Sequence, residues 1–424
     1  MLDINYIREN TELVKKACVD KQLDAQLVVD LLALDSERKP VLQQVESLRS
    51  QINANAAEIK KAVQAGDKPA ADLVENGRKL KEKLKAAEEK FKALDEKWQE
   101  LQYQIPNVPA ADVPVGADES GNQVVRQIGE KPQFDFAAQD HATIMEKLDW
   151  LDSKNAVRIG GFRTYFLKNE AVILEQAILN YALRMMIKEG FTAMNAPVMV
   201  NKAALLGTGY LPWGGEDHYY TQDGQALAGT AEVALTAYWG EQLLNEKDLP
   251  IKMTGISPCF RREVGTYGKD TRGVIRVHQF NKVEQVVYTV ADEEVTREWH
   301  EKMLGFSEQL LQDLEIPYQV LLMCTGDMGA GQRKKYDIES WFPSQGKYRE
   351  THSASYFNDF QARRLNIKYR ASDGTNKYVY TLNNTVAASP RLLACIIENY
   401  QSADGSVRVP KVLQEFMGKK VIAP

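Results

Sequence analysis

The chain has few of the residues from which metal centres and disulfide frameworks are built. Its 424 residues include four cysteines and five histidines, all of them scattered. The cysteines form no CxxC pair and have no histidine at metal-ligand spacing, so we expect no structural zinc site and no disulfide framework. The start, MLDINYIRENTELVKK, lacks the apolar core and cleavage site of a secretory signal. No run approaches about eighteen apolar residues. We therefore expect a cytoplasmic protein without a membrane span.

An excess of positive charge is also missing. The net charge is −5 and the pI is near 5.8. Taken alone, these values argue against a nucleic-acid partner, but binding to phosphates needs only a local basic surface. The distribution of charge along the chain is therefore more informative than its sum.

The N-terminal quarter has the periodicity of a helical hairpin. Apolar or small residues alternate in steps of four and three, first over 41–62 (Val41, Val45, Leu48, Ile52, Asn55, Ile59, Ala62) and then over 73–105 (Leu73, Gly77, Leu80, Leu84, Ala87, Phe91, Leu94, Trp98, Leu101, Ile105). This spacing is typical of a coiled-coil seam. The turn-forming sequence AGDKP at 65–69 separates the two series. We expect two antiparallel helices, each roughly 40–50 Å long at 1.5 Å per residue.

A hairpin of this kind has two interpretations. It can be a spacer or dimerisation rod, or it can bind a nucleic-acid backbone. Residues 49–92 contain eleven Lys or Arg against seven Asp or Glu, with a dense group at Arg78, Lys79, Lys81, Lys83 and Lys85. A local positive excess suits phosphates, but it also suits a solvated helix face.

The rest of the chain predicts an α+β domain. Residues 107–140 have the composition of a linker. Helices are expected at 141–151, 170–188, 292–314 and 390–401, and strands at 251–264, 273–289, 317–324, 335–343, 347–356 and 376–382. Long strands that follow one another without intervening helices favour an antiparallel sheet.

Two neighbouring predicted strands carry the strongest chemical signal. Alternation along 274–284 places Arg276, His278, Phe280, Lys282 and Glu284 on one face, and Ile275, Val277 and Val283 on the other. Arginine binds phosphate through paired hydrogen bonds, and phenylalanine offers a stacking plane for a base. The polar face therefore suits an anionic, ring-bearing ligand. The alternative is a solvent-facing sheet surface with cross-strand ion pairs.

Several short segments, which follow one another in the order expected for the family, resemble the seryl form of the class II aminoacyl-tRNA synthetases. FRRE at 260–263 followed by RVHQFNKVEQ at 276–285 resembles motif 2 of that family, and GTAE at 229–232 resembles its serine-binding segment. CTGDMG (324–329), KKYDIESW (334–341) and DFQARR (359–364) are similar to its core signatures. LNNT (382–385), SPR (389–391) and ENYQ (398–401) are similar to its motif 3, and 191–200 lies where motif 1 is expected. Each motif is weak alone, but their common order makes the resemblance specific. Together with the hairpin, the motifs cover nearly the whole chain.

The resemblance implies a role for each matching residue. Arg261, Arg276 and Arg391 are similar to the catalytic arginines that bind the α-phosphate and the β/γ-phosphates. Thr230, Ala231, Glu232, Arg261, Glu284, Asn383 and Thr385 resemble the serine pocket. The implied ATP site comprises Arg261, Arg262, Glu263, Arg276, Val277, His278, Gln279, Phe280, Glu350, Thr351, His352, Ser353 and Arg391, with Glu350 and Ser353 as the pair that holds Mg²⁺. His352 departs from the family, whose members usually carry a small or aliphatic residue there.

The resemblance further implies the fold, the partners and the reaction. Residues 1–110 would form a helical arm for tRNA(Ser), and residues 111–424 a catalytic domain built on an antiparallel sheet flanked by helices. The implied enzyme is a homodimer that activates L-serine with ATP and transfers it to tRNA. One alternative is a ligase that loads an amino acid onto a carrier protein, but such proteins lack the hairpin and use a cysteine-bearing zinc site. Another is a relative that binds tRNA without catalysis, against which the retained arginines and glutamates argue.

Overall fold

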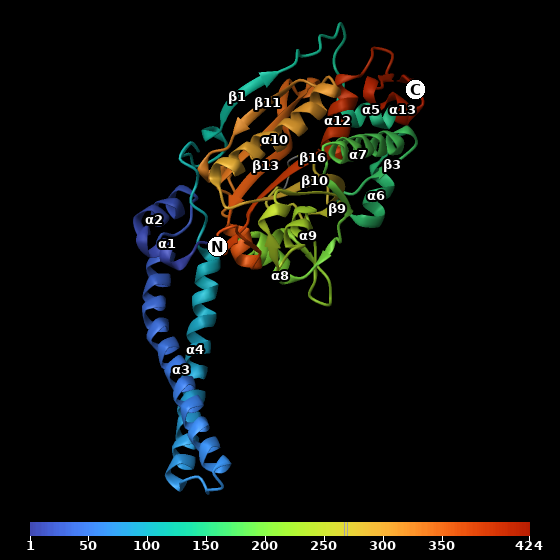
Figure 1. Cartoon of the computed structure of the whole chain (residues 1–424). Helices are drawn as coiled ribbons and strands as arrows, with labels where there is room; N and C mark the ends of the chain where they lie inside the picture. Colours follow the sequence, from blue (N-terminus) through green and yellow to red (C-terminus); the bar gives the residue numbers. More distant parts are fainter. Residues whose placement is uncertain (267, 269) are drawn as a thin grey trace. The chain divides into compact units, whose positions relative to one another are not determined.

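The computed structural model describes residues 1–266, 268 and 270–424, and the chain divides into two compact units. One unit comprises Leu2–Val19 and Leu23–Pro106, and the other comprises Met1, Asp20–Gln22 and Asn107–Pro424 (Figure 1). Among the described residues, no helix combines the length and the apolar character that crossing a membrane requires.

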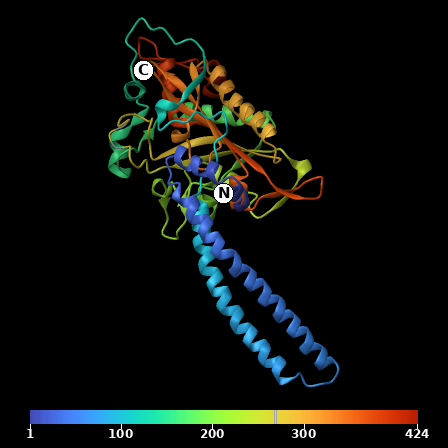
Figure 2. The same cartoon turned by 90° about the vertical axis from the view of Figure 1, so that its left-hand side faces the viewer.

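The smaller unit is a pair of long antiparallel helices with two short helices before them (Figure 2). The short ones are α1 (Ile4–Glu9) and α2 (Thr11–Asp20), and the long ones are α3 (Gln26–Gln64, 39 residues) and α4 (Ala71–Gln104, 34 residues). At 1.5 Å per residue the long helices extend roughly 58 and 51 Å, somewhat more than the heptad series predicted. The additional length lies mainly at the start of α3, because Pro40 is accommodated inside the helix.

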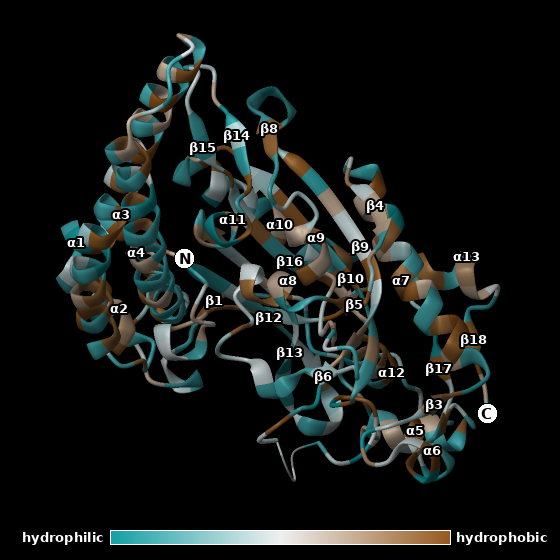
Figure 3. Ribbon diagram, turned by 90° about the horizontal axis from the view of Figure 1, so that it is seen from below, coloured by the Kyte–Doolittle hydropathy of each residue, from teal (hydrophilic) through white to brown (hydrophobic). Residues whose placement is uncertain are grey.

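The seam of the hairpin confirms the predicted coiled coil. Every residue of the two heptad series is buried or half-buried, with Val45, Leu48, Leu80 and Ala87 at the centre. In Figure 3 both long helices are mostly hydrophilic, with hydrophobic bands between. Such a pattern suits helices that bury a single stripe.

The larger unit is built on an eight-stranded sheet in the order β1-β11-β12-β13-β16-β10-β9-β4. Neighbouring strands are antiparallel except β4 and β9, which are parallel, so the predicted antiparallel sheet is confirmed. The strands of this sheet are β1 (Gln123–Ile128), β4 (Thr192–Asn195), β9 (Ile251–Phe260), β10 (Gln279–Thr289), β11 (Tyr318–Leu322), β12 (Lys334–Phe342), β13 (Lys347–Asn358) and β16 (Tyr380–Ala388). Shorter strands form small accessory sheets: β2 (Leu151–Asp152), β3 (Phe166–Leu167), β5 (Met199–Val200), β6 (Tyr219–Tyr220), β7 (Ala226–Leu227), β8 (Leu243–Asn245), β14 (Lys368–Arg370), β15 (Asn376–Tyr378), β17 (Val407–Arg408) and β18 (Val421–Ile422).

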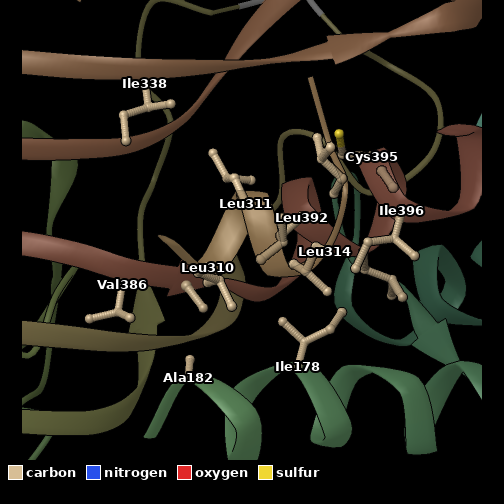
Figure 4. Close-up of a cluster of buried hydrophobic side chains, with 14 of the residues drawn as sticks. Ile178, Ala182, Leu310, Leu311, Leu314, Ile338, Val386, Leu392, Cys395 and Ile396 are labelled. Carbon is tan, nitrogen blue, oxygen red and sulfur yellow. The ribbon is translucent and has the colours of Figure 1, made fainter. Parts of the chain in front are cut away.

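Three helices pack with the sheet around the main core: α7 (Glu170–Lys188), α10 (Glu293–Asp313) and α12 (Ser389–Asn399). Figure 4 shows how Ile178 of α7, Leu310 of α10, Leu392 of α12 and Val386 of β16 meet there. The remaining helices are α5 (His141–Lys147), α6 (Ser153–Gly160), α8 (Lys202–Thr208), α9 (Glu232–Ala237), α11 (Phe360–Leu365) and α13 (Gln414–Met417). Since neighbouring strand residues point to opposite faces, a core position at Val386 leaves Thr385 for the other face.

Two sequence predictions in this unit are wrong. The predicted linker contains β1, an edge strand that pairs with β11, although its burial pattern is largely exposed. Such a strand lacks the alternation of apolar residues by which the other strands were recognised. The strand predicted over 273–289 begins only at Gln279, because 270–276 form a series of bends that includes Gly273 at φ +79°.

Candidate functional site

A cavity of about 520 Å³ opens where β10, β13 and β16 run side by side. The end of β9 and the start of α12 complete its wall. The lining residues are Arg261, Glu263, Ile275, Val277, Phe280, Lys282, Glu350, Thr351, His352, Ser353, Thr385, Ala388, Pro390 and Arg391. These residues lie up to 130 positions apart in the sequence, and the antiparallel sheet brings them together.

An arginine and an aromatic ring face each other in this cavity. The guanidinium carbon of Arg261 lies 5.4 Å from the centroid of the Phe280 ring. The Arg261 carbonyl accepts a hydrogen bond from Nδ1 of His278 at 2.8 Å, and its Nε donates to the carbonyl of Gly229 at 3.4 Å. Arg261 is therefore held from both ends beside a flat apolar surface.

The loop between β9 and β10 brings a second arginine to the site. Glu263, which follows the end of β9, adopts a left-handed backbone at φ +56° and accepts a hydrogen bond from Nη1 of Arg276 at 2.6 Å. Asp270 lies 3.6 Å from Nε of Arg276 and 2.7 Å from Nη2 of Arg349. These opposite charges fix the direction of Arg276 although it lies outside a strand.

The third arginine comes from the first turn of α12. Nη1 of Arg391 donates to the carbonyl and the carboxylate of Glu350, at 2.9 and 3.1 Å, and its Nε donates to the carbonyl of Ile275 at 3.2 Å. Burial acts to raise the pKa of Glu350, but Arg391 and Lys335 outweigh it and hold the pKa below its ordinary range. Glu350 is therefore a carboxylate at neutral pH.

A buried ion pair lies beside this cavity, on β10. Nζ of Lys282 lies 2.5 Å from Oε2 of Glu284 and donates to Oγ1 of Thr230 at 2.7 Å. The hydroxyl of Thr385, opposite Glu284 on β16, donates to the same Glu284 oxygen at 3.4 Å. Because all four side chains are buried, their polar groups depend on one another for hydrogen bonds.

Glu232 extends the polar network into a second cavity of about 720 Å³, which Thr208, Tyr210 and Trp213 also line. Its carboxylate accepts hydrogen bonds from the hydroxyl of Tyr210 at 2.7 Å and from the amide of Gln361 at 3.0 Å. Burial, followed by the charge of Glu284, raises the pKa of Glu232 to about 7. This carboxyl can therefore gain or lose a proton near neutral pH.

The structure brings together many of the predicted site residues, but not all in one cavity. The first cavity is lined by ten of them: Arg261, Glu263, Val277, Phe280, Glu350, Thr351, His352, Ser353, Thr385 and Arg391. Arg276 lines an adjoining cavity of about 1200 Å³ together with Glu350 and Arg391. Gln279 lines a further cavity of about 620 Å³ that shares Phe280 with the first.

The remaining predicted residues lie behind or beside these walls. Thr230, Ala231, Glu284 and Asn383 are buried behind them, and His278 supports Arg261. Arg262 points elsewhere, because its Nη1 donates to the carbonyl of Glu216 at 2.9 Å.

The predicted division of 274–284 into two faces is wrong. Ile275 and Val277 were placed opposite Phe280 and Lys282, yet all four line the same cavity. Alternation applies only within a strand, and residues 275–277 precede β10. The strand predicted over 251–264 likewise ends earlier, at Phe260, so Arg261 and Glu263 lie outside β9.

His352 lines the first cavity, but its side chain is almost completely buried. It is 1% exposed, its Nδ1 lies 2.9 Å from the hydroxyl of Thr351, and burial lowers its pKa to about 4. The histidine is therefore neutral at physiological pH and adds no charge to the cavity.

The oxygen atoms of Glu350 and Ser353 are candidate cation ligands in this cavity. Among the residues that the structure describes, no cluster of three or more His, Cys, Asp or Glu could hold a metal ion by itself. Glu350 and Ser353 nevertheless place a carboxylate and a hydroxyl on the same wall. Magnesium is commonly bound by one or two carboxylates together with substrate phosphates, so this donor set fits Mg²⁺ on a nucleotide.

Some residues that build the site carried little sequence signal. Tyr210 lies outside the recognised motifs, and Asp270 meets both Arg276 and Arg349 only after the loop has folded. Gln361 falls inside the DFQARR segment, but the segment does not reveal that its amide meets Glu232. Such partners follow from tertiary contacts and not from spacing along the chain.

Comparison with protein families matches both parts of the chain. Residues 1–109 match the seryl-tRNA synthetase N-terminal domain, and residues 219–400 match the class II core domain of tRNA synthetases for G, H, P, S and T. A serine--tRNA ligase from Deinococcus radiodurans is 43% identical over 424 residues, covering 100% of this chain and 99% of the relative.

Solved structures resemble the chain over its whole length. The seryl-tRNA synthetase from Pyrococcus horikoshii complexed with ATP aligns with a TM-score of 0.90 at 40% identity, covering 100% of both chains. The cytoplasmic serine-tRNA ligase from Naegleria fowleri in complex with AMP aligns with a TM-score of 0.86 at 33% identity, covering 100% of this chain and 99% of the other.

Proposed function

The chain belongs to the seryl-tRNA synthetase family, and from that premise we propose that it activates L-serine with ATP as seryl-adenylate and transfers the serine to tRNA(Ser). The observation that carries the proposal is the convergence of Arg261, Phe280, Glu350 and Arg391 on one cavity. This combination suits a nucleoside triphosphate. The aromatic plane suits the base, the three arginines, including the adjoining Arg276, suit the phosphates, and the carboxylate suits the accompanying Mg²⁺.

ATP would bind with its adenine stacked on Phe280 and contacted by Glu263. Arg261 would bind the α-phosphate, and Arg276 and Arg391 the β- and γ-phosphates. Bidentate guanidinium groups suit phosphate oxygens, which supports these assignments. Glu350 and Ser353 would hold Mg²⁺, which supplies positive charge at the phosphates when bound. The backbone around Arg262, Val277, His278, Gln279, Thr351 and His352 would complete the walls of the ATP site.

Serine would bind on the side of the buried polar network. Glu232 and Glu284 would recognise the amino and hydroxyl groups, Arg261 would bind the carboxylate, and Thr230, Ala231, Asn383 and Thr385 would close the pocket. The amide nitrogen of Asn383 is buried without a hydrogen-bond partner among the described residues, which supports a polar ligand nearby. A pocket that hydrogen-bonds a hydroxyl rejects an analogue lacking it by about 10⁴–10⁵.

The first chemical step requires no general base. A serine carboxylate is already ionised at neutral pH, so it can attack the α-phosphorus directly and displace pyrophosphate. Arg261, Arg276 and Arg391 would hold two anions in line and neutralise the charge that develops on the phosphates. In the second step a ribose hydroxyl at the end of the tRNA attacks the adenylate carbonyl and releases AMP.

The tRNA partner would bind to residues 1–110, and residues 111–424 would form the catalytic domain. The side chains of Arg78, Lys79, Lys81, Lys83 and Lys85 are all exposed on α4, which supports contact with a phosphate backbone. We propose that the reaction takes place in the cytoplasm, the compartment named for the similar serine-tRNA ligase from Naegleria fowleri.

A homodimer would form through the motif 1 region at 191–200. Strand β4 is the last strand of the sheet, and Ile187 and Met199 near it are 50% and 56% exposed. Large apolar side chains beside an open strand edge favour association with a second copy.

Serine-dependent exchange of pyrophosphate into ATP, assayed across all twenty amino acids, tests the proposed function. We expect exchange with serine far above that with threonine or alanine, followed by charging of tRNA with a long variable arm. Exchange with another amino acid, or none with serine, would contradict the proposal.

A further inference from the structure

His141, the first residue of α5, connects two chain segments that carry phosphate-binding arginines. It is 3% exposed, and its ring lies between the end of the β9–β10 loop and helix α12. Nε2 accepts a hydrogen bond from the backbone N–H of Val274 at 3.3 Å, and Nδ1 lies 2.9 Å from Oε1 of Glu398. A carboxylate can only accept, so Nδ1 carries the proton and the free Nε2 faces the loop.

Glu398 holds the His141 ring on the side of α12. It belongs to the ENYQ segment, to which the proposed reaction assigns no role. The residue is completely buried in α12, seven positions after Arg391. Its Oε1 also accepts from the backbone N–H of His141, and its Oε2 accepts from the backbone N–H of Ser344, both at 3.1 Å. With each oxygen occupied, the carboxylate fixes the imidazole relative to α12.

The loop side is fitted closely to the imidazole. Gly273 has φ +79°, and a Cβ there would lie 2.1 Å from Nε2 of His141, so only glycine lets the loop approach this far. Val274, the next residue, is fully buried, and the carbonyl of Ile275 then accepts from Nε of Arg391 at 3.2 Å. The contact to His141 therefore lies one residue before the contact between loop and Arg391, and two residues before Arg276.

Ion pairs at the surface also connect α5 to the loop. Arg272 lies 2.8 Å from Glu146 and 3.6 Å from Asp140, the residue that caps α5. Its side chain is 56% exposed, so these ion pairs are weaker than the buried contact of His141.

We propose that His141 is a positioning residue for ATP: it locks the returning end of the β9–β10 loop to α12, so that Arg276 and Arg391 face the same phosphates. The inference rests on the proposed function, in which these two arginines bind the β- and γ-phosphates. His141 does not touch the substrate, and it acts through the backbone of residues 273–276 and through Glu398.

Substitutions at His141 separate the two bonds of the ring. His141→Asn retains an N–H near Nδ1 for Glu398 but has no atom at the position of Nε2, so the loop is released. His141→Gln retains an acceptor that can reach the N–H of Val274. In pyrophosphate exchange we expect His141→Asn to raise the KM for ATP roughly fivefold, as expected for the loss of one buried hydrogen bond, with the KM for serine unchanged. We expect His141→Gln to restore at least half of that loss.

Tyr400→Phe is the matched control for stability. The hydroxyl of Tyr400, at the C-terminal end of the same helix, donates to the carbonyl of Leu314 at 2.7 Å and does not touch the loop. Tyr400→Phe removes one buried hydrogen bond and is expected to lower the melting temperature without changing the KM for ATP. If His141→Asn does not fold, the exposed change Arg272→Gln replaces it, with an expected rise of about twofold.

Arg391→Ala separates failure of the inference from failure of the proposed site. If Arg391→Ala raises the KM for ATP while His141→Asn lowers only the melting temperature, as Tyr400→Phe does, the positioning role is wrong and the site stands. If Arg391→Ala leaves the KM for ATP unchanged, both are wrong. Equal rises in the KM for ATP and for serine in His141→Asn would also overturn the positioning role, because they indicate general damage to the cavity.

Discussion

The two units of the chain differ in how their contacts are arranged: those of the hairpin repeat along the sequence, and those of the sheet unit do not. The hairpin of α3 and α4 repeats one type of contact along its seam, in which Val45, Leu48, Leu80 and Ala87 form the centre. The contacts in the sheet unit, by contrast, are not repeated. They are made by single residues from separate elements, such as Arg261, Glu350 and Arg391. When one layer of a repeating seam is weakened, the neighbouring layers still hold the two helices together. When one partner of a buried ion pair is removed, no other group neutralises the charge that remains.

This difference separates two kinds of vulnerability. Substitutions in the hairpin should act gradually, on stability and on the affinity for tRNA. Substitutions in the sheet unit should act abruptly, on adenylate formation. The predictions below test the contrast, beginning with the largest expected effect.

Removing the hairpin should abolish one reaction and spare the other. Deletion of residues 41–105 takes away most of α3 and α4, including the exposed basic group on α4. We expect charging of tRNA to fall below detection, because the proposed contacts of the hairpin with tRNA phosphates are lost. Serine-dependent pyrophosphate exchange should remain within about threefold of the intact chain, since each unit has its own core. Charging that survived the deletion would assign the hairpin another task.

In the sheet unit, the buried pair of Lys282 and Glu284 should show the abrupt behaviour. Glu284→Ala should abolish serine-dependent exchange, and it should also destabilise the protein by about 3–5 kcal/mol, because it leaves the buried Lys282 ammonium unpaired. Adding Lys282→Met should recover most of the stability in denaturant titrations but none of the exchange. Exchange that returned with stability would show that Glu284 is structural and does not bind serine.

The fold could be predicted from the sequence wherever one element determines its own pattern. The heptads of the hairpin, the helices α7, α10 and α12 and the succession of antiparallel strands were visible, because helices and half-buried strands impose periods of 3.6 and 2 residues. The helix predicted over 141–151 is shorter, because α5 ends at Lys147 and Leu151 begins β2. Strand β1 was missed because it is an exposed edge strand without that alternation. The start of β10 was misplaced because residues 270–276 bend at a left-handed glycine that leaves no mark on polarity.

The candidate site could be predicted as a set of residues but not as a geometry. Motif resemblance identified Arg261, Phe280, Glu350 and Arg391 before any contact was known. It did not reveal that Glu232 opens into a second cavity, or that Tyr210 and Gln361 bind its carboxylate. Those contacts depend on how separate elements pack, and local spacing carries no record of that.

The raised pKa of Glu232 gives a pH test of the proposed serine pocket. Burial and Glu284 raise its pKa to about 7, so the carboxylate forms as the pH rises through that value. A serine ammonium group needs the carboxylate, and below about pH 7 the KM for serine should therefore rise by about tenfold per pH unit. Pyrophosphate exchange measured between pH 5.5 and 8.5 gives this profile, with the KM for ATP as the internal control. Glu232→Gln should have a high KM for serine that does not vary with pH, and a Gln variant that kept the slope would remove Glu232 from the pocket.

The smallest expected effect lies in the one seam layer of the hairpin that breaks the apolar pattern. Asn55 is 7% exposed, and its Nδ2 donates to the carbonyl of Leu73 at 3.2 Å and lies where a Cβ on Gly77 would come within 2.8 Å. A buried Asn in a seam fixes the register at a cost in stability. Here the connection at residues 65–70 already sets the register, so Asn55→Leu should stabilise the hairpin by about 1 kcal/mol, measured by hydrogen exchange of α3 amides. Gln51→Leu, at an exposed position of the same helix, controls for helix propensity. The KM for tRNA should change less than about twofold, since the basic face of α4 is untouched. A large rise in that KM would show that Asn55 specifies the register and that the hairpin is less tolerant than its repeating seam implies.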